Sequence, residues 1–104
     1  MKIRKKKCKC KKCVKFRKEY SFDFLDIYGL YYSIAEYLAP RLKAFKKYTF
    51  SHPCNISMKE WKTILNKMII AFQIIAKEGF TEKDTKKIEE GFKLFIEYYH
   101  DLWI

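Results

Sequence analysis

The segment 58–78 has the spacing of apolar residues that most restricts what this chain can fold into. Its apolar side chains follow one another at steps of three and four, at Trp61, Leu65, Met68, Phe72 and Ile75. Steps of this size line one face of an α-helix. Ser57 and Glu60 form the Ser-x-x-Glu pattern of a capping box at its start, and Gly79 is the residue type that favours a left-handed helix end. The pattern predicts an amphipathic helix.

Two further segments have the same periodicity. The first spans about 26–48 and carries Ile27, Leu30, Tyr31, Ile34, Leu38, Leu42 and Phe45. Pro40 removes a backbone donor within it, so we expect a kink or a restart there, with Pro40 as the first residue of the second half. The second segment spans about 82–103, follows the N-cap Thr81 and carries Ile88, Phe92, Phe95, Tyr99 and Leu102. Within it, Gly91 is a weak point that the helix tolerates.

These three helices predict an all-α fold. No run alternates with a period of two over a length that indicates a strand, and 104 residues suffice for one domain. Short connections between amphipathic helices favour antiparallel packing. We therefore expect a compact antiparallel three-helix bundle over 21–104, with its first helix kinked at Pro40. A basic, Cys-containing N-terminal arm over 1–20 precedes it.

The arm holds the whole excess of positive charge. The formal charge is +11, and of 23 basic residues eleven lie in 1–18, where there is no acid, so that the other 12 match the 12 acidic residues. Such an arm binds phosphate backbones by releasing counterions, although a solvated tail has the same composition. Lysines near the end of the first helix either extend this surface or complement a helix end. The candidate nucleic-acid-binding residues are Arg4, Lys5, Lys6, Lys7, Lys9, Lys11, Lys12, Lys15, Arg17, Lys18, Lys43, Lys46 and Lys47.

Five residues have the chemistry of zinc ligands. Cys8, Cys10 and Cys13 lie within the arm, and His52 and Cys54 lie in the loop after the first helix. Structural zinc takes four thiolate or imidazole ligands in a tetrahedron. Closure of the arm onto the loop would pin it to the bundle and make it a structured element. The alternative is a set of free thiols in a flexible tail.

The sequence lacks the patterns of common enzymes and of membrane proteins. It has no nucleophile elbow, phosphate-binding Gly-rich loop or His-Glu-x-x-His motif, and His52 and His100 are its only imidazoles. We therefore expect no catalytic residues. The longest apolar stretch, 68–76, is far shorter than the ~18–20 residues of a membrane span, and no apolar segment follows the basic start as in a signal peptide. These features predict a cytoplasmic protein without membrane contact.

Aromatic residues are more numerous than the interior needs. They make up 18% of the chain, whereas a helix buries only about a third to a half of its surface. Exposed Tyr and Trp are typical anchors of protein interfaces, including homodimers. The alternative is a core of large residues whose Tyr hydroxyls reach water. The candidate interface residues are Tyr28, Tyr32, Tyr37, Tyr98 and Trp103.

From Leu38 onward the chain resembles a family of short, largely uncharacterised bacteriophage proteins. The matching residues are Leu38-Ala-Pro-Arg-Leu42, His52-Pro53, Lys59-Glu-Trp61 and Tyr98-Tyr-His-Asp-Leu-Trp103, and the basic arm lies outside the shared pattern. The resemblance implies a phage or prophage origin and an intracellular helical protein, and it lends no activity.

Three functional hypotheses follow. The first is a non-enzymatic phage accessory protein that binds a host protein or nucleoprotein complex, for example to inhibit a host defence system. The second is a zinc-stabilised nucleic-acid-binding protein that uses its basic arm. The third is a binder of a small anionic ligand such as a nucleotide, held by Lys or Arg beside Tyr rings.

Overall fold

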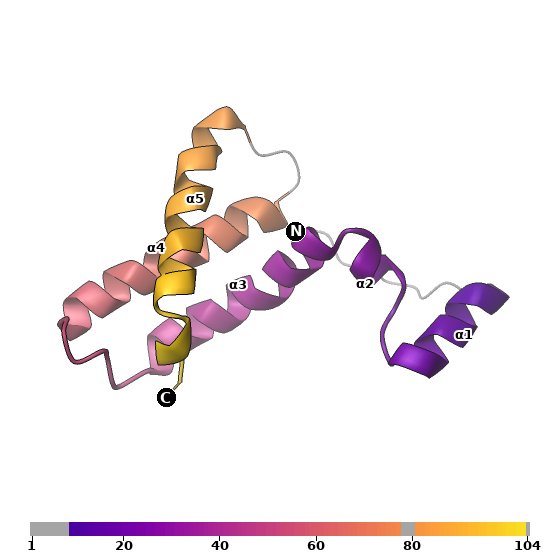
Figure 1. The fold of residues 1–104 in the computed structure, drawn as a ribbon, viewed down its shortest axis with the longest axis horizontal. Coiled ribbons are helices and arrows are strands. Elements are labelled where there is room, and N and C mark those ends of the chain that lie inside the picture. Colours follow the sequence, from indigo (N-terminus) through magenta and orange to yellow (C-terminus); the bar gives the residue numbers. More distant parts are fainter. Residues whose placement is uncertain (1–8, 78–80, 104) are drawn as a thin grey trace.

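Five α-helices and one short 3-10 helix make up the structure, a computed structural model that describes residues 9–77 and 81–103 (Figure 1). No strand occurs in these two ranges, and the predicted all-α class is confirmed. The helices are α1 (Lys11–Tyr20), α2 (Leu25–Tyr28), α3 (Leu30–Tyr48), α4 (Met58–Ala76), α5 (Glu82–Glu97) and the 3-10 helix η1 (Tyr99–Asp101).

Helix α4 begins where the sequence predicts. The Ser57 hydroxyl accepts a hydrogen bond from the Glu60 amide at 3.1 Å, and the Glu60 carboxylate accepts one from the Ser57 amide at 2.9 Å. The capping box is therefore confirmed. The predicted stop at Gly79 lies outside the described residues. Helix α5 begins with a second capping box, in which the Asp84 carboxylate accepts from the Thr81 amide at 3.0 Å.

The first predicted helix is interrupted at a different residue from the one expected. Helix α3 continues through Pro40 without a restart, whereas Gly29, with φ −119° and ψ 62°, separates α2 from α3. Pro40 is exposed, so water can satisfy the carbonyl that loses its partner at the proline. On the other side of α3, contacts of the buried Ala39 and Leu42 with the core hold the helix in place.

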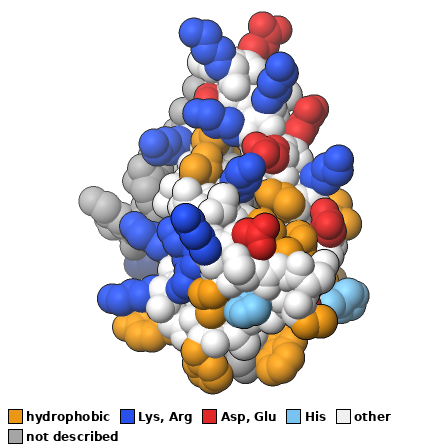
Figure 2. Space-filling view, turned by 90° about the vertical axis from the view of Figure 1, so that its left-hand side faces the viewer, with side chains coloured by type: hydrophobic (Ala, Val, Ile, Leu, Met, Phe, Trp, Pro, Cys, Tyr) orange, Lys and Arg blue, Asp and Glu red, His pale blue; other side chains and the backbone are white. Residues whose placement is uncertain are grey.

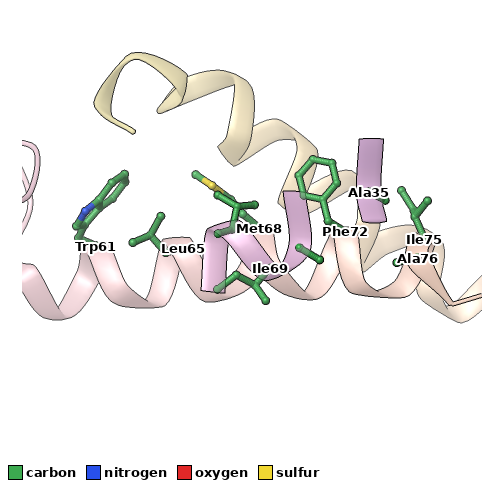
Figure 3. Packing of buried hydrophobic residues seen from close by; sticks show 10 residues of the cluster. Ala35, Trp61, Leu65, Met68, Ile69, Phe72, Ile75 and Ala76 are labelled. Atoms are coloured by element: carbon green, nitrogen blue, oxygen red, sulfur yellow. The ribbon is translucent and has the colours of Figure 1, made fainter. Parts of the chain in front are cut away.

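Helix α4 lies at the centre of the packing. Helices α3 and α4 run side by side in opposite directions, and α5 crosses α4 near its middle (Figure 1). Along α4 the buried side chains form a continuous row (Figure 3). The largest fully buried ones are Trp61, Leu65 and Met68. The predicted helical bundle is thus confirmed, with the apolar stripe of α4 as its core.

The crossing of α4 and α5 depends on Gly91. This glycine is buried, and a Cβ at its position would overlap the Ala71 Cβ and lie 2.7 Å from the Lys67 carbonyl oxygen. The absence of a side chain lets the two helix backbones approach closely. Helix α5 continues through Gly91, as predicted, and the close approach gives this glycine a packing role that the sequence did not indicate.

Helix α1 lies at one end of the molecule, away from the bundle (Figure 1), and none of its residues is buried. Its Phe16 ring contacts the rings of Tyr20, Phe22 and Phe24 at centroid distances of 4.7, 5.7 and 5.5 Å. Arg17 pairs with Asp23 at 3.2 Å. These contacts hold α1 against the residues that follow it and not against the bundle. The molecule measures 52 × 33 × 20 Å, and α1 forms a projection at one end of it.

Candidate interaction surfaces

Three helix ends meet at Trp61. Its ring lies 6.5 Å from the Phe45 ring of α3 and 5.6 Å from the Tyr98 ring that follows α5, and Trp61 itself is only 1% exposed. The end of α3, the start of α4 and the end of α5 are therefore anchored to one buried side chain. We call this part of the bundle the Trp61 end.

The Trp61 end carries aromatic side chains that the bundle does not bury. Tyr48 and Phe50 follow Phe45 in the chain and are 65% and 77% exposed, and Trp103 near the C-terminus is 68% exposed. Figure 2 looks at this side of the molecule and shows hydrophobic side chains gathered at its base, with basic side chains beside them. Exposed aromatic anchors next to cations are typical of surfaces that bind other macromolecules.

Lysines of α3 and α4 come together at the same end. The Lys62 ammonium donates to the Lys46 carbonyl, the Lys46 ammonium donates to the Asn66 amide oxygen at 3.3 Å, and the Lys47 ammonium lies 5.4 Å from the Tyr48 ring centroid. In the ranges that the structure describes, no carboxylate lies within 4.0 Å of these three lysines. Their positive charge is therefore not cancelled by a nearby anion.

The predicted nucleic-acid-binding residues fall on two separate surfaces. Lys9 precedes α1, and Lys11, Lys12, Lys15, Arg17 and Lys18 lie on it, whereas Lys43, Lys46 and Lys47 lie on the C-terminal half of α3. Helix α3 has 19 residues, and at ~1.5 Å per residue it is about 28 Å long. It therefore holds the two described groups at opposite ends (Figure 1), an arrangement that favours the alternative in which these α3 lysines complement a helix end. Arg4, Lys5, Lys6 and Lys7 lie outside the described residues.

The predicted zinc ligands are not brought together. Cys10 and Cys13 belong to the α1 region, and His52 and Cys54 belong to the loop between α3 and α4 at the other end of the molecule (Figure 1). Cys8 lies outside the described residues. Among residues 9–77 and 81–103, no group of three or more His, Cys, Asp or Glu is placed to hold a metal. Helix α3 separates α1 from the loop (Figure 1), so the described part of the arm does not close onto it.

The predicted interface aromatics divide into two kinds. Tyr28, Tyr37 and Trp103 are exposed, whereas Tyr32 and Tyr98 are half-buried. The Tyr32 hydroxyl donates to the Glu36 carboxylate at 3.3 Å, and Tyr98 packs on the core. Tyr48 and Phe50 are exposed aromatics that sequence reasoning missed. Their signal is their position at the end of the first predicted helix, where no later apolar residue continues the stripe that would bury them.

A second apolar surface lies on α2 and the N-terminal half of α3. Two grooves of about 440 and 420 Å³ open there and share Ile34. The first is lined by Phe22, Asp26, Ile27, Leu30, Ser33, Ile34, Tyr37 and Leu38. The second lies between α3 and α5 and includes Tyr31, Phe72, Ile88 and Phe92. We call the exposed apolar residues of 22–37 the α2–α3 face.

The chain matches no protein-family model, no curated protein and no solved structure. In the ranges that the structure describes, no helix combines the length and the apolar character needed to cross a bilayer.

Proposed function

We propose that this chain is a non-enzymatic, phage-type accessory protein that binds a host protein or nucleoprotein complex through the Trp61 end. The observation that supports the proposal is the juxtaposition of exposed aromatic rings with Lys46, Lys47 and Lys62, none of which has a carboxylate partner among the described residues. Inhibition of a host defence system is one use of such binding.

Two physical effects favour this partner class. An exposed Trp or Phe that becomes buried supplies most of the binding energy of an interface, because these side chains hide a large apolar area. Lysines without local counterions attract acidic or phosphate-bearing partners and speed their association. A partner that has both an apolar pocket and negative charge can bind the aromatic rings and the lysines of the Trp61 end at the same time.

Helix α1 supports a second candidate function, nucleic-acid binding by the arm. Lys11, Lys12, Lys15 and Lys18 are exposed on this helix, and α1 has no acidic residue in its first turn. Such a helix attracts phosphate backbones without sequence preference. In the first proposal α1 adds this attraction to docking at the Trp61 end. In the second, which includes the zinc-stabilised arm, α1 acts alone.

The test compares three purified proteins in capture from bacterial lysate, before and after nuclease treatment. They are the wild type, the Phe50→Ser/Trp103→Ser double variant and the control Tyr28→Ser. Tyr28 is 79% exposed but lies on α2, at the other end of the bundle. The proposal expects a defined protein partner that the double variant loses and the control keeps.

Two results would contradict the proposal. One is capture of the same protein by the wild type and the double variant. The other is the absence of any specific partner for the wild type. Capture that disappears with nuclease and with substitution of the α1 lysines, while the double variant behaves as wild type, would favour the second candidate function.

A further inference from the structure

We propose that the α2–α3 face is the interface of a homodimer, in which a second copy of this chain packs against α3. This inference goes beyond the proposed function, because it concerns a different surface from the Trp61 end. It rests on the two apolar sides of α3, on the apolar area that one of these sides exposes and on the small number of charged residues that line the two grooves.

Helix α3 is apolar on two sides, and the chain covers one of them. Ala35, Ala39 and Leu42 are buried in the core that α3 forms with α4. Leu30 and Ile34 are 51% and 44% exposed, and neither belongs to the core or to the residues packed against it. A surface helix needs one apolar stripe, so the second stripe is available to a partner.

The exposed area matches what a stable complex buries. Nine large apolar side chains in 22–37 are each 43–79% exposed: Phe22, Phe24, Leu25, Ile27, Tyr28, Leu30, Tyr31, Ile34 and Tyr37. Since large aromatic side chains each offer about 150–250 Å², the nine together expose on the order of 900 Å², and six of the nine line the two grooves. The largest apolar patch of a typical monomer covers about 300–600 Å², whereas each partner in a stable complex buries about 800 Å².

The chemistry of the face favours a second copy as its occupant. Asp26 is the one acidic or basic residue that lines the first groove, and Glu89 is the one that lines the second. The Asp26 carboxylate accepts a hydrogen bond from the Asp23 amide at 3.3 Å. Because the two grooves are otherwise lined by apolar and uncharged polar side chains, binding here depends mainly on apolar burial. Two copies bring the same mainly apolar surfaces together, so the contact buries apolar area while two carboxylates from the grooves of each copy add like charge. Arg41, whose guanidinium lies 3.7 Å from the Tyr37 ring centroid, marks the charged edge.

A twofold axis near Ile34 satisfies this arrangement. Ile34 lies between Leu30 and Tyr37 and is shared by both grooves, so an axis there places Ile34 against its own copy. We place this axis perpendicular to α3, so that the two α3 helices run antiparallel. Because α1 lies beyond the start of α3 (Figure 1), the antiparallel arrangement places the two basic α1 helices at opposite ends of the dimer.

The test is the molar mass of the full chain by sedimentation velocity over a dilution series, without nucleic acid and at high salt. We expect the wild type to sediment as a dimer, and Ile34→Glu and Ile34→Lys each to sediment as monomers, because each variant places like charges across the axis. An equimolar mixture of the two variants should restore a dimer, since opposite charges then face each other. The matched control Phe50→Glu changes an equally apolar, exposed residue at the Trp61 end and should remain dimeric.

A second variant protects the test against misfolding. Leu30→Ser lies at the first residue of α3 and should raise the dimer dissociation constant roughly tenfold or more through reduced apolar burial, with an unchanged circular dichroism spectrum. A wild type that is monomeric at every concentration would overturn the proposal. A folded Ile34→Glu variant that stays dimeric, or variants that do not pair when mixed, would overturn it as well. Partner capture by the Trp61 end is measured separately, so failure of either proposal leaves the other to its own test.

Discussion

Gly91 of α5 lies directly on Ala71 of α4, so closely that a single methyl group at position 91 would overlap the Ala71 side chain. Gly91→Ala should therefore destabilise the protein by about 1–3 kcal/mol, as overpacking typically does, although alanine has the higher helix propensity. Chemical denaturation measures the change. Gly29→Ala is the matched control, because a Cβ at position 29 meets nothing within 4 Å. It should leave stability unchanged or raise it by about 0.4–1 kcal/mol.

Trp61 holds the ends of three helices together, and its removal should be among the most costly substitutions. Trp61→Ala should lower the free energy of unfolding by about 3–5 kcal/mol, as expected for a fully buried aromatic residue. The same change at Trp103, which is 68% exposed, should cost less than about 0.5 kcal/mol. Equal effects of the two substitutions in thermal denaturation would contradict the central position of Trp61.

The capping box of α4 should contribute measurably to stability. Ser57→Ala removes the hydroxyl that accepts from the Glu60 amide and should cost about 1 kcal/mol. Thr63 lies exposed in the second turn of α4, where its hydroxyl donates to the Lys59 carbonyl at 3.1 Å. Thr63→Ala should be neutral or slightly stabilising, because alanine is the better helix former. Denaturation curves of the two variants distinguish a cap effect from a general effect of alanine.

Nucleic-acid binding, where present, should depend on α1. Replacing its four exposed lysines by glutamine should weaken binding to a DNA duplex and reduce the slope of log K against log salt by about 0.9 for each phosphate that is no longer neutralised. The variant carries substitutions at Lys11, Lys12, Lys15 and Lys18. A control with the same number of charges removed from α5 carries substitutions at Lys83, Lys86, Lys87 and Lys93. Equal weakening in the two variants would show that net charge alone governs binding.

Metal binding by the arm should not involve the loop between α3 and α4. If zinc is bound, the Cys10→Ser/Cys13→Ser variant should lose it, whereas His52→Ala and Cys54→Ser should retain the wild-type stoichiometry, because the loop lies at the opposite end of the molecule from α1 (Figure 1). Elemental analysis of protein purified without chelator measures the stoichiometry. Loss of the metal in the loop variants would mean that the arm can reach the far end of the bundle.

Local signals predicted α4 and the start of α5, but they did not predict helix α1 within the arm. They also did not predict the end of α5 at Glu97, after which η1 replaces the last turn of the predicted helix 82–103. The start of α4 follows from Ser57 and Glu60, which meet within one turn, and its buried face follows from period alone. Whether Pro40 interrupts the helix depends instead on contacts with α4. Residues of α3 before and after the proline are buried against α4, and these contacts keep the helix continuous. Gly91 gave no local sign of its packing role, because the residue that it touches is twenty positions away in another helix.

The interaction surfaces were only partly predictable for the same reason. Composition identified the basic arm and the surplus of aromatic residues, but exposure depends on which neighbours cover each ring. The Tyr98 ring packs on the Trp61 ring, whereas the Tyr48 and Phe50 side chains are exposed. The distance between Lys43 and α1 depends on α3 being one uninterrupted helix, which the sequence did not predict.

The isolation of α1 from the bundle makes this helix an exchangeable module. Because no residue of α1 is buried, selection can add, remove or exchange its lysines and cysteines without a compensating change in the core. Substitutions of the core residues of α4 require compensating changes, since this helix packs against both α3 and α5. The charge of α1 and the stability of the bundle can therefore evolve independently within one short chain.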